Sequence, residues 1–131
     1  MVDCSRKRVL LAEDEEDHAR LCAYVLRTRS NCEVVHEKTC AGAVARLNSG
    51  NFDLVIVDLK MAECSGLEIL KHLKASRSPA KTLVITGLNV SEGRLSDLGY
   101  QPDALRLKPL EFGELVRLAS DLLEGRHDVA I

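Results

Sequence analysis

The chain has 131 residues, of which 46% are hydrophobic and 29% charged, and its formal net charge is −2. This length and balance predict one soluble globular domain over residues 1–131, with a core at about 7–124 and a flexible tail at 125–131. The weak net charge excludes an overall basic field for nucleic acid, so we expect no direct nucleic-acid partner. No apolar run approaches the roughly 20 residues that span a bilayer, and no secretory signal begins the chain, so we expect a cytoplasmic protein with no membrane partner.

Strand-like and helix-like segments alternate along the whole chain. Short β-branched runs bounded by polar residues predict strands, and apolar residues at helical spacing, such as Ala19, Cys22 and Leu26, predict helices. The predicted strands are residues 8–12, 32–37, 53–58, 81–86 and 104–108, and the predicted helices are 15–29, 39–50, 65–76, 91–98 and 110–123. Five strand–helix units of this kind form a parallel sheet with helices on both faces, because strand–helix–strand crossovers are right-handed.

Five cysteines occur, and their spacing matches neither a Cys-x-x-Cys pair nor a zinc site with the four histidines. The count is odd and no signal peptide precedes them, so we expect reduced thiols. The histidines are equally scattered, and none is expected to bind a metal.

Polar side chains of particular types follow the predicted strands. Glu13 and Asp14 come after the first strand, Asp58 closes the most apolar run of the chain, Thr86 ends the fourth strand, and Lys108 follows the fifth. The carboxyl ends of parallel strands form the edge at which open α/β sheets bind ligands, so these groups should meet there.

Such a group of residues suits phosphoryl chemistry. Clustered carboxylates repel phosphate and each other, and a hard dication such as Mg²⁺, which prefers oxygen ligands, relieves both effects. An ammonium and a hydroxyl, from Lys108 and Thr86, would then meet the charge on phosphoryl oxygens. The alternative for the acids alone is a solvated helix N-terminus that binds no metal.

Five short motifs stand in a fixed order along the chain: Glu13-Asp14, Asp58-x-x-Met61, Gly66 eight positions after the aspartate, Thr86-Gly87 and Lys108-Pro109. In these motifs and their order the chain resembles the receiver domain of two-component response regulators (CheY-like). The resemblance covers about residues 7–124.

The resemblance implies a flavodoxin-like three-layer fold with strand order 2-1-3-4-5. It implies that Asp58 is the phosphoacceptor in a Mg²⁺-dependent transfer from a phosphohistidine. Mg²⁺ would be bound by Asp14, Asp58 and the Lys60 carbonyl, and by Glu13 mostly through water. Thr86, Gly87 and Lys108 would form the phosphoryl-binding and switch positions, and the bond before Pro109 is expected to be cis.

Further implications concern partners. A sensor histidine kinase or histidine phosphotransfer domain would supply the phosphoryl group to an otherwise non-enzymatic domain, which would at most catalyse its own phosphorylation and dephosphorylation. The output partner is not identified by the sequence. A homodimer could form through the fourth helix, fifth strand and fifth helix. We also expect Lys60 to face Glu15 across the mouth of the site.

Two positions depart from the family pattern. Ala62 stands where Pro is frequent, which loosens the loop without removing a ligand. Leu105 stands where an aromatic residue often swings inward on activation, so the aromatic half of the usual switch is missing.

Two alternatives remain at this level. A phosphorylation-independent pseudo-receiver would act as an interaction module, and Leu105 favours it. A haloacid-dehalogenase-type (HAD-type) phosphatase also uses an aspartyl nucleophile, but that nucleophile ends the first strand in an Asp-x-Asp pattern, whereas Asp14-Glu15-Glu16 stands here.

Overall fold

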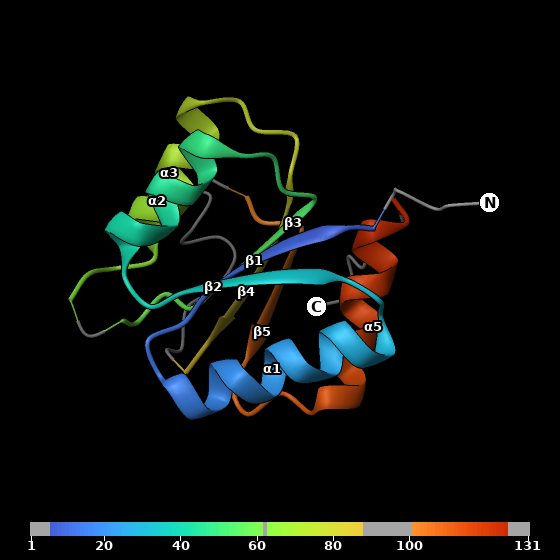
Figure 1. Ribbon diagram of the computed structural model, residues 1–131. Helices are drawn as coiled ribbons and strands as arrows, with labels where there is room; N and C mark the ends of the chain where they lie inside the picture. Colours follow the sequence, from blue (N-terminus) through green and yellow to red (C-terminus); the bar gives the residue numbers. More distant parts are fainter. Residues whose placement is uncertain (1–5, 62, 88–100, 126–131) are drawn as a thin grey trace.

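The computed structural model describes residues 6–61, 63–87 and 101–125. Five parallel strands form one sheet in the order β2-β1-β3-β4-β5, as predicted (Figure 1). The elements are β1 (Arg8–Ala12), α1 (Glu16–Arg29), β2 (Glu33–Glu37), α2 (Cys40–Ser49), β3 (Leu54–Val57), α3 (Leu67–Ala75), β4 (Lys81–Thr86), β5 (Ala104–Leu107) and α5 (Phe112–Leu123). The predicted helix at 91–98, residue Ala62 and residues 126–131 of the expected tail lie outside the described residues.

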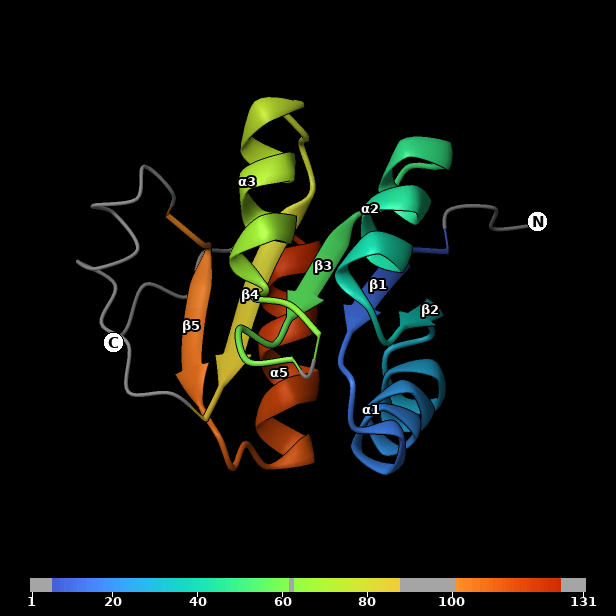
Figure 2. The same cartoon turned by 90° about the vertical axis from the view of Figure 1, so that its left-hand side faces the viewer.

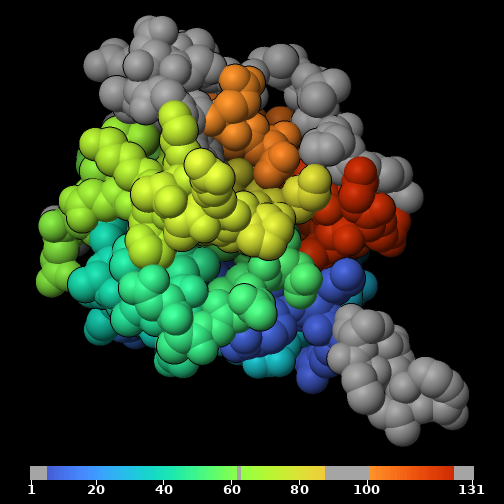
Figure 3. Space-filling model, turned by 90° about the horizontal axis from the view of Figure 1, so that it is seen from above, coloured from blue at the N-terminus to red at the C-terminus, as the bar shows by residue number. Residues whose placement is uncertain are grey.

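Helices cover both faces of the sheet, which gives three layers. Helices α1 and α5 pack on one face, and α2 and α3 on the other (Figures 1 and 2). Figure 3 views the molecule from the side of α2 and α3, which lie next to each other. None of the helices in the described part of the chain is long and apolar enough to cross a membrane.

The side chains of the central strands belong to two separate hydrophobic cores, one on each face of the sheet. In β3, Leu54 and Ile56 join the cluster under α1 and α5, whereas Val55 and Val57 join the cluster under α2 and α3. Strand β1 alternates in the same way. Successive side chains of a strand point to opposite faces, so a strand covered on both faces must be apolar at every position. This explains why the run before Asp58 is the most apolar in the chain.

The helix ends differ slightly from the prediction. Thr39 caps α2, because its Oγ1 accepts a hydrogen bond of 2.9 Å from the Gly42 amide. Gly50 follows the last residue of α2, but its φ of −164° is extended, so the helix does not end in the left-handed turn typical of a C-terminal glycine. Helix α5 begins at Phe112, two residues after the predicted start at Leu110.

Candidate phosphoryl-transfer site

The parallel register brings the chain segments after β1 and β3 side by side. Ala12 pairs with Val57 at the last position of both strands. The next residues, Glu13-Asp14 and Asp58, therefore leave the sheet together at its carboxyl edge, where we expected them.

The acids of this edge form one compact cluster. Glu13 is 4% exposed and Asp58 6% exposed, and Asp14 is half-buried. One carboxylate oxygen from each of the three residues lies within 4.8 Å of the other two. Buried carboxylates need a cation or hydrogen-bond donors, since an isolated buried charge is costly. The donor set consists of hard oxygens, which fits Mg²⁺.

Lys108 supplies a positive charge to this cluster. It follows β5, two strands away from β3, and its long side chain spans the intervening strand. Its Nζ donates to Asp58 Oδ2 at 2.8 Å and to Glu13 Oε1 at 3.2 Å. Burial by itself would lower the pKa of Lys108, but the hydrogen bond to Asp58 and the charges of Glu13 and Asp58 outweigh it and raise the pKa. The lysine is therefore held as an ammonium.

The loop after β3 orients Asp58 from the other side. The Lys60 amide donates to Asp58 Oδ1 at 3.0 Å, and Lys60 pairs with Ser65 in a short antiparallel bridge. The Gly66 amide closes this loop with a bond of 2.9 Å to the Leu59 carbonyl. A Cβ on Gly66 would overlap the Asp58 carbonyl oxygen and lie 2.7 Å from Val57 Cγ1. Glycine is therefore required for α3 to start this close to the end of β3.

The other predicted site residues lie at the ends of β4 and β5. Thr86 is fully buried, and its carbonyl accepts a hydrogen bond of 2.9 Å from the Lys108 amide. Gly87 is exposed, with open space where a side chain would be. Leu105 is only half-buried and packs against the cluster under α2 and α3. The Lys108–Pro109 peptide bond is cis, in agreement with the expectation.

One expected contact is absent from the described residues. Lys60 and Glu15 are both exposed, and no ion pair joins them there. An exposed pair of this kind would contribute only about 0.2–1 kcal/mol, so little is lost when it does not form.

Histidine 18 is a neighbour of the site that the sequence did not indicate. Its Nδ1 lies 3.2 Å from Glu13 Oε1, and its ring stacks on Phe112 of α5 with centroids 6.3 Å apart. The expectation that no histidine binds a metal is not tested by this contact, which places His18 beside the acid cluster. Its spacing from Glu13 spans the turn between β1 and α1, and the geometry of that turn cannot be read from helical periodicity.

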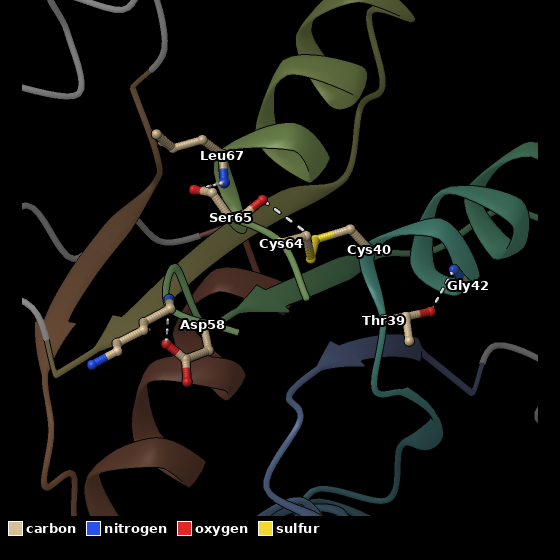
Figure 4. The surroundings of a disulfide bond; sticks show 8 residues. Thr39, Cys40, Gly42, Asp58, Cys64, Ser65 and Leu67 are labelled. Atoms are coloured by element: carbon tan, nitrogen blue, oxygen red, sulfur yellow. Dashed lines mark hydrogen bonds between the residues drawn. A yellow bond between two sulfur atoms is a disulfide. The ribbon is translucent and has the colours of Figure 1, made fainter. Parts of the chain in front are cut away.

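The expectation of reduced thiols is wrong for two of the cysteines. Cys40, the first residue of α2, forms a disulfide bond with Cys64 in the loop after Asp58 (Figure 4). Their Cα atoms lie 6.3 Å apart, within the usual range for a disulfide. The two residues are 24 positions apart in the sequence, and only the packing of α2 against this loop brings them together.

Comparison with known proteins agrees with this geometry. Residues 9–120 match the family described as the response regulator receiver domain. The response regulator ArlR of Staphylococcus haemolyticus is 31% identical over 107 residues, which are 82% of this chain and 48% of that protein. The cell cycle response regulator CtrA of Brucella ovis is 26% identical over 113 residues, covering 83% of this chain and 47% of that protein. The chain thus spans about half the length of these curated relatives.

Solved structures show the same fold. A CheY-like receiver domain of Methanospirillum hungatei superposes with a TM-score of 0.82 at 25% identity, covering 92% of this chain and 95% of the other. The response regulator TrrA of Thermotoga maritima, solved in complex with Mg²⁺-BeF, superposes with a TM-score of 0.77 at 28% identity, covering 88% and 98%.

A parallel five-stranded sheet with an acid–lysine cluster at its carboxyl edge defines a CheY-like signalling fold. The chain belongs to the response regulator receiver domain family of two-component systems. Membership of this family gives the HAD-type phosphatase alternative no support.

Proposed function

We propose that Asp58 accepts a phosphoryl group from a phosphohistidine and that the phosphorylated state carries a signal or passes the group on. The observation that carries this proposal is the cluster itself. A buried Asp58 lies within hydrogen-bonding distance of the Lys108 ammonium, and one of its oxygens lies within 4.8 Å of an oxygen of Glu13 and of Asp14. A purely structural carboxylate would not need two further acids beside it.

In the proposed transfer, a carboxylate oxygen of Asp58 forms a bond to phosphorus while the bond from phosphorus to the imidazole nitrogen of the donor breaks. The imidazole keeps the electron pair of the broken bond. Charge on the transferring group is spread over its outer oxygens, so positioned cations and donors lower the barrier. The Lys108 ammonium already donates to Asp58 and would donate to a phosphoryl oxygen after the transfer. The Thr86 hydroxyl would donate to another phosphoryl oxygen.

The residues also fit a resident Mg²⁺ ion. Asp14, Asp58 and the Lys60 carbonyl would hold it directly, and Glu13 mostly through water. When bound, the ion supplies positive charge that offsets the repulsion between the acid cluster and an anionic donor. The Thermotoga maritima relative, solved with Mg²⁺-BeF, supports this assignment by similarity. Gly87 adds no side chain at the end of β4, which would leave room for a donor to approach Asp58.

The finer features of the proposal concern context. We infer a single receiver domain over residues 1–131 that acts in the cytoplasm with a sensor histidine kinase or a histidine phosphotransfer domain. It would be a signalling domain that at most catalyses its own phosphorylation and dephosphorylation. Homodimerisation through the face that includes β5 and α5 belongs to the same proposal, and the exposed Leu107 at the end of β5 supports it.

Binding of a phosphoryl mimic tests the site without requiring a kinase. Beryllofluoride with Mg²⁺ should shift the amide resonances of Asp58, Lys60, Thr86 and Lys108 in a ¹H–¹⁵N spectrum. The Asp58→Asn variant should show no such shifts, because it lacks the carboxylate that binds beryllium. Absence of shifts in the wild-type protein would favour the phosphorylation-independent alternative.

A further inference from the structure

We propose that Cys40 and Cys64 form a reversible dithiol–disulfide site, and that its oxidation state sets how fast Asp58 is phosphorylated. The inference rests on the proposed function of Asp58. Nothing in the receiver chemistry described above needs either cysteine.

The disulfide joins a fixed element to the loop that orients Asp58. Cys40 begins α2, and the preceding Thr39 fixes that helix end through hydrogen bonds from the Gly42 and Ala43 amides, the latter at 3.0 Å. Cys64 lies in the loop after Asp58, where its carbonyl accepts a bond of 3.3 Å from the Met61 amide. Figure 4 shows the two sulfurs between α2 and this loop, with Asp58 at the other end of the loop. Formation of the Cys40–Cys64 disulfide therefore attaches the loop covalently to the start of α2.

The loop connects the sulfurs to the phosphorylation site through few contacts. Ser65, next to Cys64, forms the short bridge with Lys60. The Lys60 amide holds Asp58 Oδ1, and the Lys60 carbonyl is a proposed Mg²⁺ ligand. Loss of the disulfide frees the Cys64 side of the loop, so Lys60 is held less firmly. Misplacement of reacting groups by about 1 Å can cost up to about 100-fold in rate.

The structure suits both oxidation states. Cys40 Sγ lies 3.3 Å from the Ser65 carbonyl oxygen, to which the reduced thiol can donate. The buried Cys40 would therefore keep a partner after reduction. Cys64 is half-buried, so it is the sulfur that an external thiol or disulfide reaches first. In the proposed cytoplasmic location a disulfide is reduced and reformed rather than permanent.

The other described cysteines do not share these properties. Cys22 and Cys32 are free and buried. Burial, helped by the charge of Glu13, raises the pKa of the Cys22 thiol to about 11, and burial also raises the pKa of Cys32. Since the thiolate is the reactive form, neither competes for an oxidant at neutral pH.

Oxidation would proceed by exchange with a small-molecule disulfide such as oxidised glutathione. The Cys64 thiolate attacks one sulfur of that disulfide, forms a mixed disulfide and releases one glutathione thiolate. The Cys40 thiolate then attacks Cys64 Sγ and releases the second glutathione. Two cysteine thiols are oxidised, the small disulfide is reduced to two thiols, and the two cysteine protons pass to the released thiolates.

The test compares the whole chain in its two oxidation states. Wild-type protein is treated with oxidised glutathione or with a phosphine reductant, and alkylation followed by mass spectrometry identifies the state of each cysteine. The initial rate of Asp58 phosphorylation by acetyl phosphate with Mg²⁺ is measured in both. Hydrogen exchange of the peptide covering residues 59–66 is measured in parallel, because it reports loop motion without any phosphoryl transfer. Cys64→Ser and Cys40→Ser remove the bond, and Cys32→Ala is the matched control that retains it.

Reduction should slow labelling roughly tenfold, within the range that loss of positioning allows, and should speed exchange of the loop. Cys64→Ser and Cys40→Ser should match the reduced protein in both buffers, and Cys32→Ala should respond like wild type. Equal labelling rates and equal exchange in the two states, or failure of Cys40 and Cys64 to pair, would overturn the inference while leaving the proposed function intact. Absence of labelling in both states would instead contradict the proposed function, and this inference with it.

Discussion

Replacement of Lys108 by methionine gives a direct measure of how much the acid cluster depends on its cation. Methionine keeps most of the volume of the side chain but removes the ammonium that bonds to Asp58 at 2.8 Å and to Glu13 at 3.2 Å. Both carboxylates then remain buried and lose the positive charge of Lys108. We expect this loss to destabilise the fold strongly at neutral pH.

The size of the effect follows from the contacts. A hydrogen bond to a charged group is worth about 1.5–3 kcal/mol, and two such bonds are lost. Removing one partner from a buried ion pair costs about 3–5 kcal/mol. The Lys108 side chain is 24% exposed, so we expect the lower end, about 3 kcal/mol. With a urea dependence of about 1–3 kcal/mol per molar, the unfolding midpoint should fall by roughly 1.5 M.

The assay is urea unfolding at pH 7, followed by far-UV circular dichroism, with and without Mg²⁺. Mg²⁺ should stabilise Lys108→Met more than wild type, because the dication replaces a charge that wild type already has. Lys60→Met is the matched control, since Lys60 is an exposed lysine of the same edge and should change stability by less than about 0.5 kcal/mol. A loss below about 1 kcal/mol in Lys108→Met, or an equal Mg²⁺ effect in both proteins, would refute the reasoning.

Three further predictions follow from the same geometry. The pKa of Lys108 in the folded protein is raised above its value of about 10.4 in the unfolded chain, so the charged lysine stabilises the fold below that pH, and this stability is lost as pH rises through the folded pKa. Wild type should therefore lose stability in that alkaline range more steeply than Lys108→Met. Parallel curves of urea midpoint against pH would contradict this. Gly66→Ala should destabilise the fold by about 1–3 kcal/mol, because the new Cβ overlaps the Asp58 carbonyl. The control Gly113→Ala in α5 should stabilise the fold by about 0.5–1 kcal/mol. Similar urea midpoints for the two variants would count against the steric argument. Chelation of Mg²⁺ should abolish labelling of Asp58 by acetyl phosphate, Asp14→Ala should nearly abolish it, and Glu13→Ala should only slow it. Full labelling of Asp14→Ala would exclude Asp14 as a metal ligand.

The sequence predicted the strand ends well because they depend on one robust rule. An apolar run that must be buried on both faces, as in Leu54–Val57, has few alternatives, and parallel strands bring their carboxyl ends to one edge. The meeting of Glu13, Asp58 and Lys108 follows from this topology alone, as does the need for a side chain as long as lysine.

The contacts that the sequence missed depend on how helices pack against loops. The Cys40–Cys64 bond requires α2 to lie against the loop after Asp58, and His18 requires a particular turn after Glu13. Neither distance is set by helical or strand periodicity. For Gly66 the sequence predicted the position but not the reason. The family pattern includes a glycine there, and only the fold shows that its backbone lies close to the Asp58 carbonyl.

The most direct test of the central proposal is the intact mass of the protein after incubation with acetyl phosphate and Mg²⁺. The account predicts a gain of one phosphoryl group in wild type, lost again on treatment with hydroxylamine, and no gain in Asp58→Asn. A phosphoryl group retained in Asp58→Asn, or none in wild type whose fold is verified by circular dichroism, would contradict the assignment of Asp58 as the phosphoacceptor.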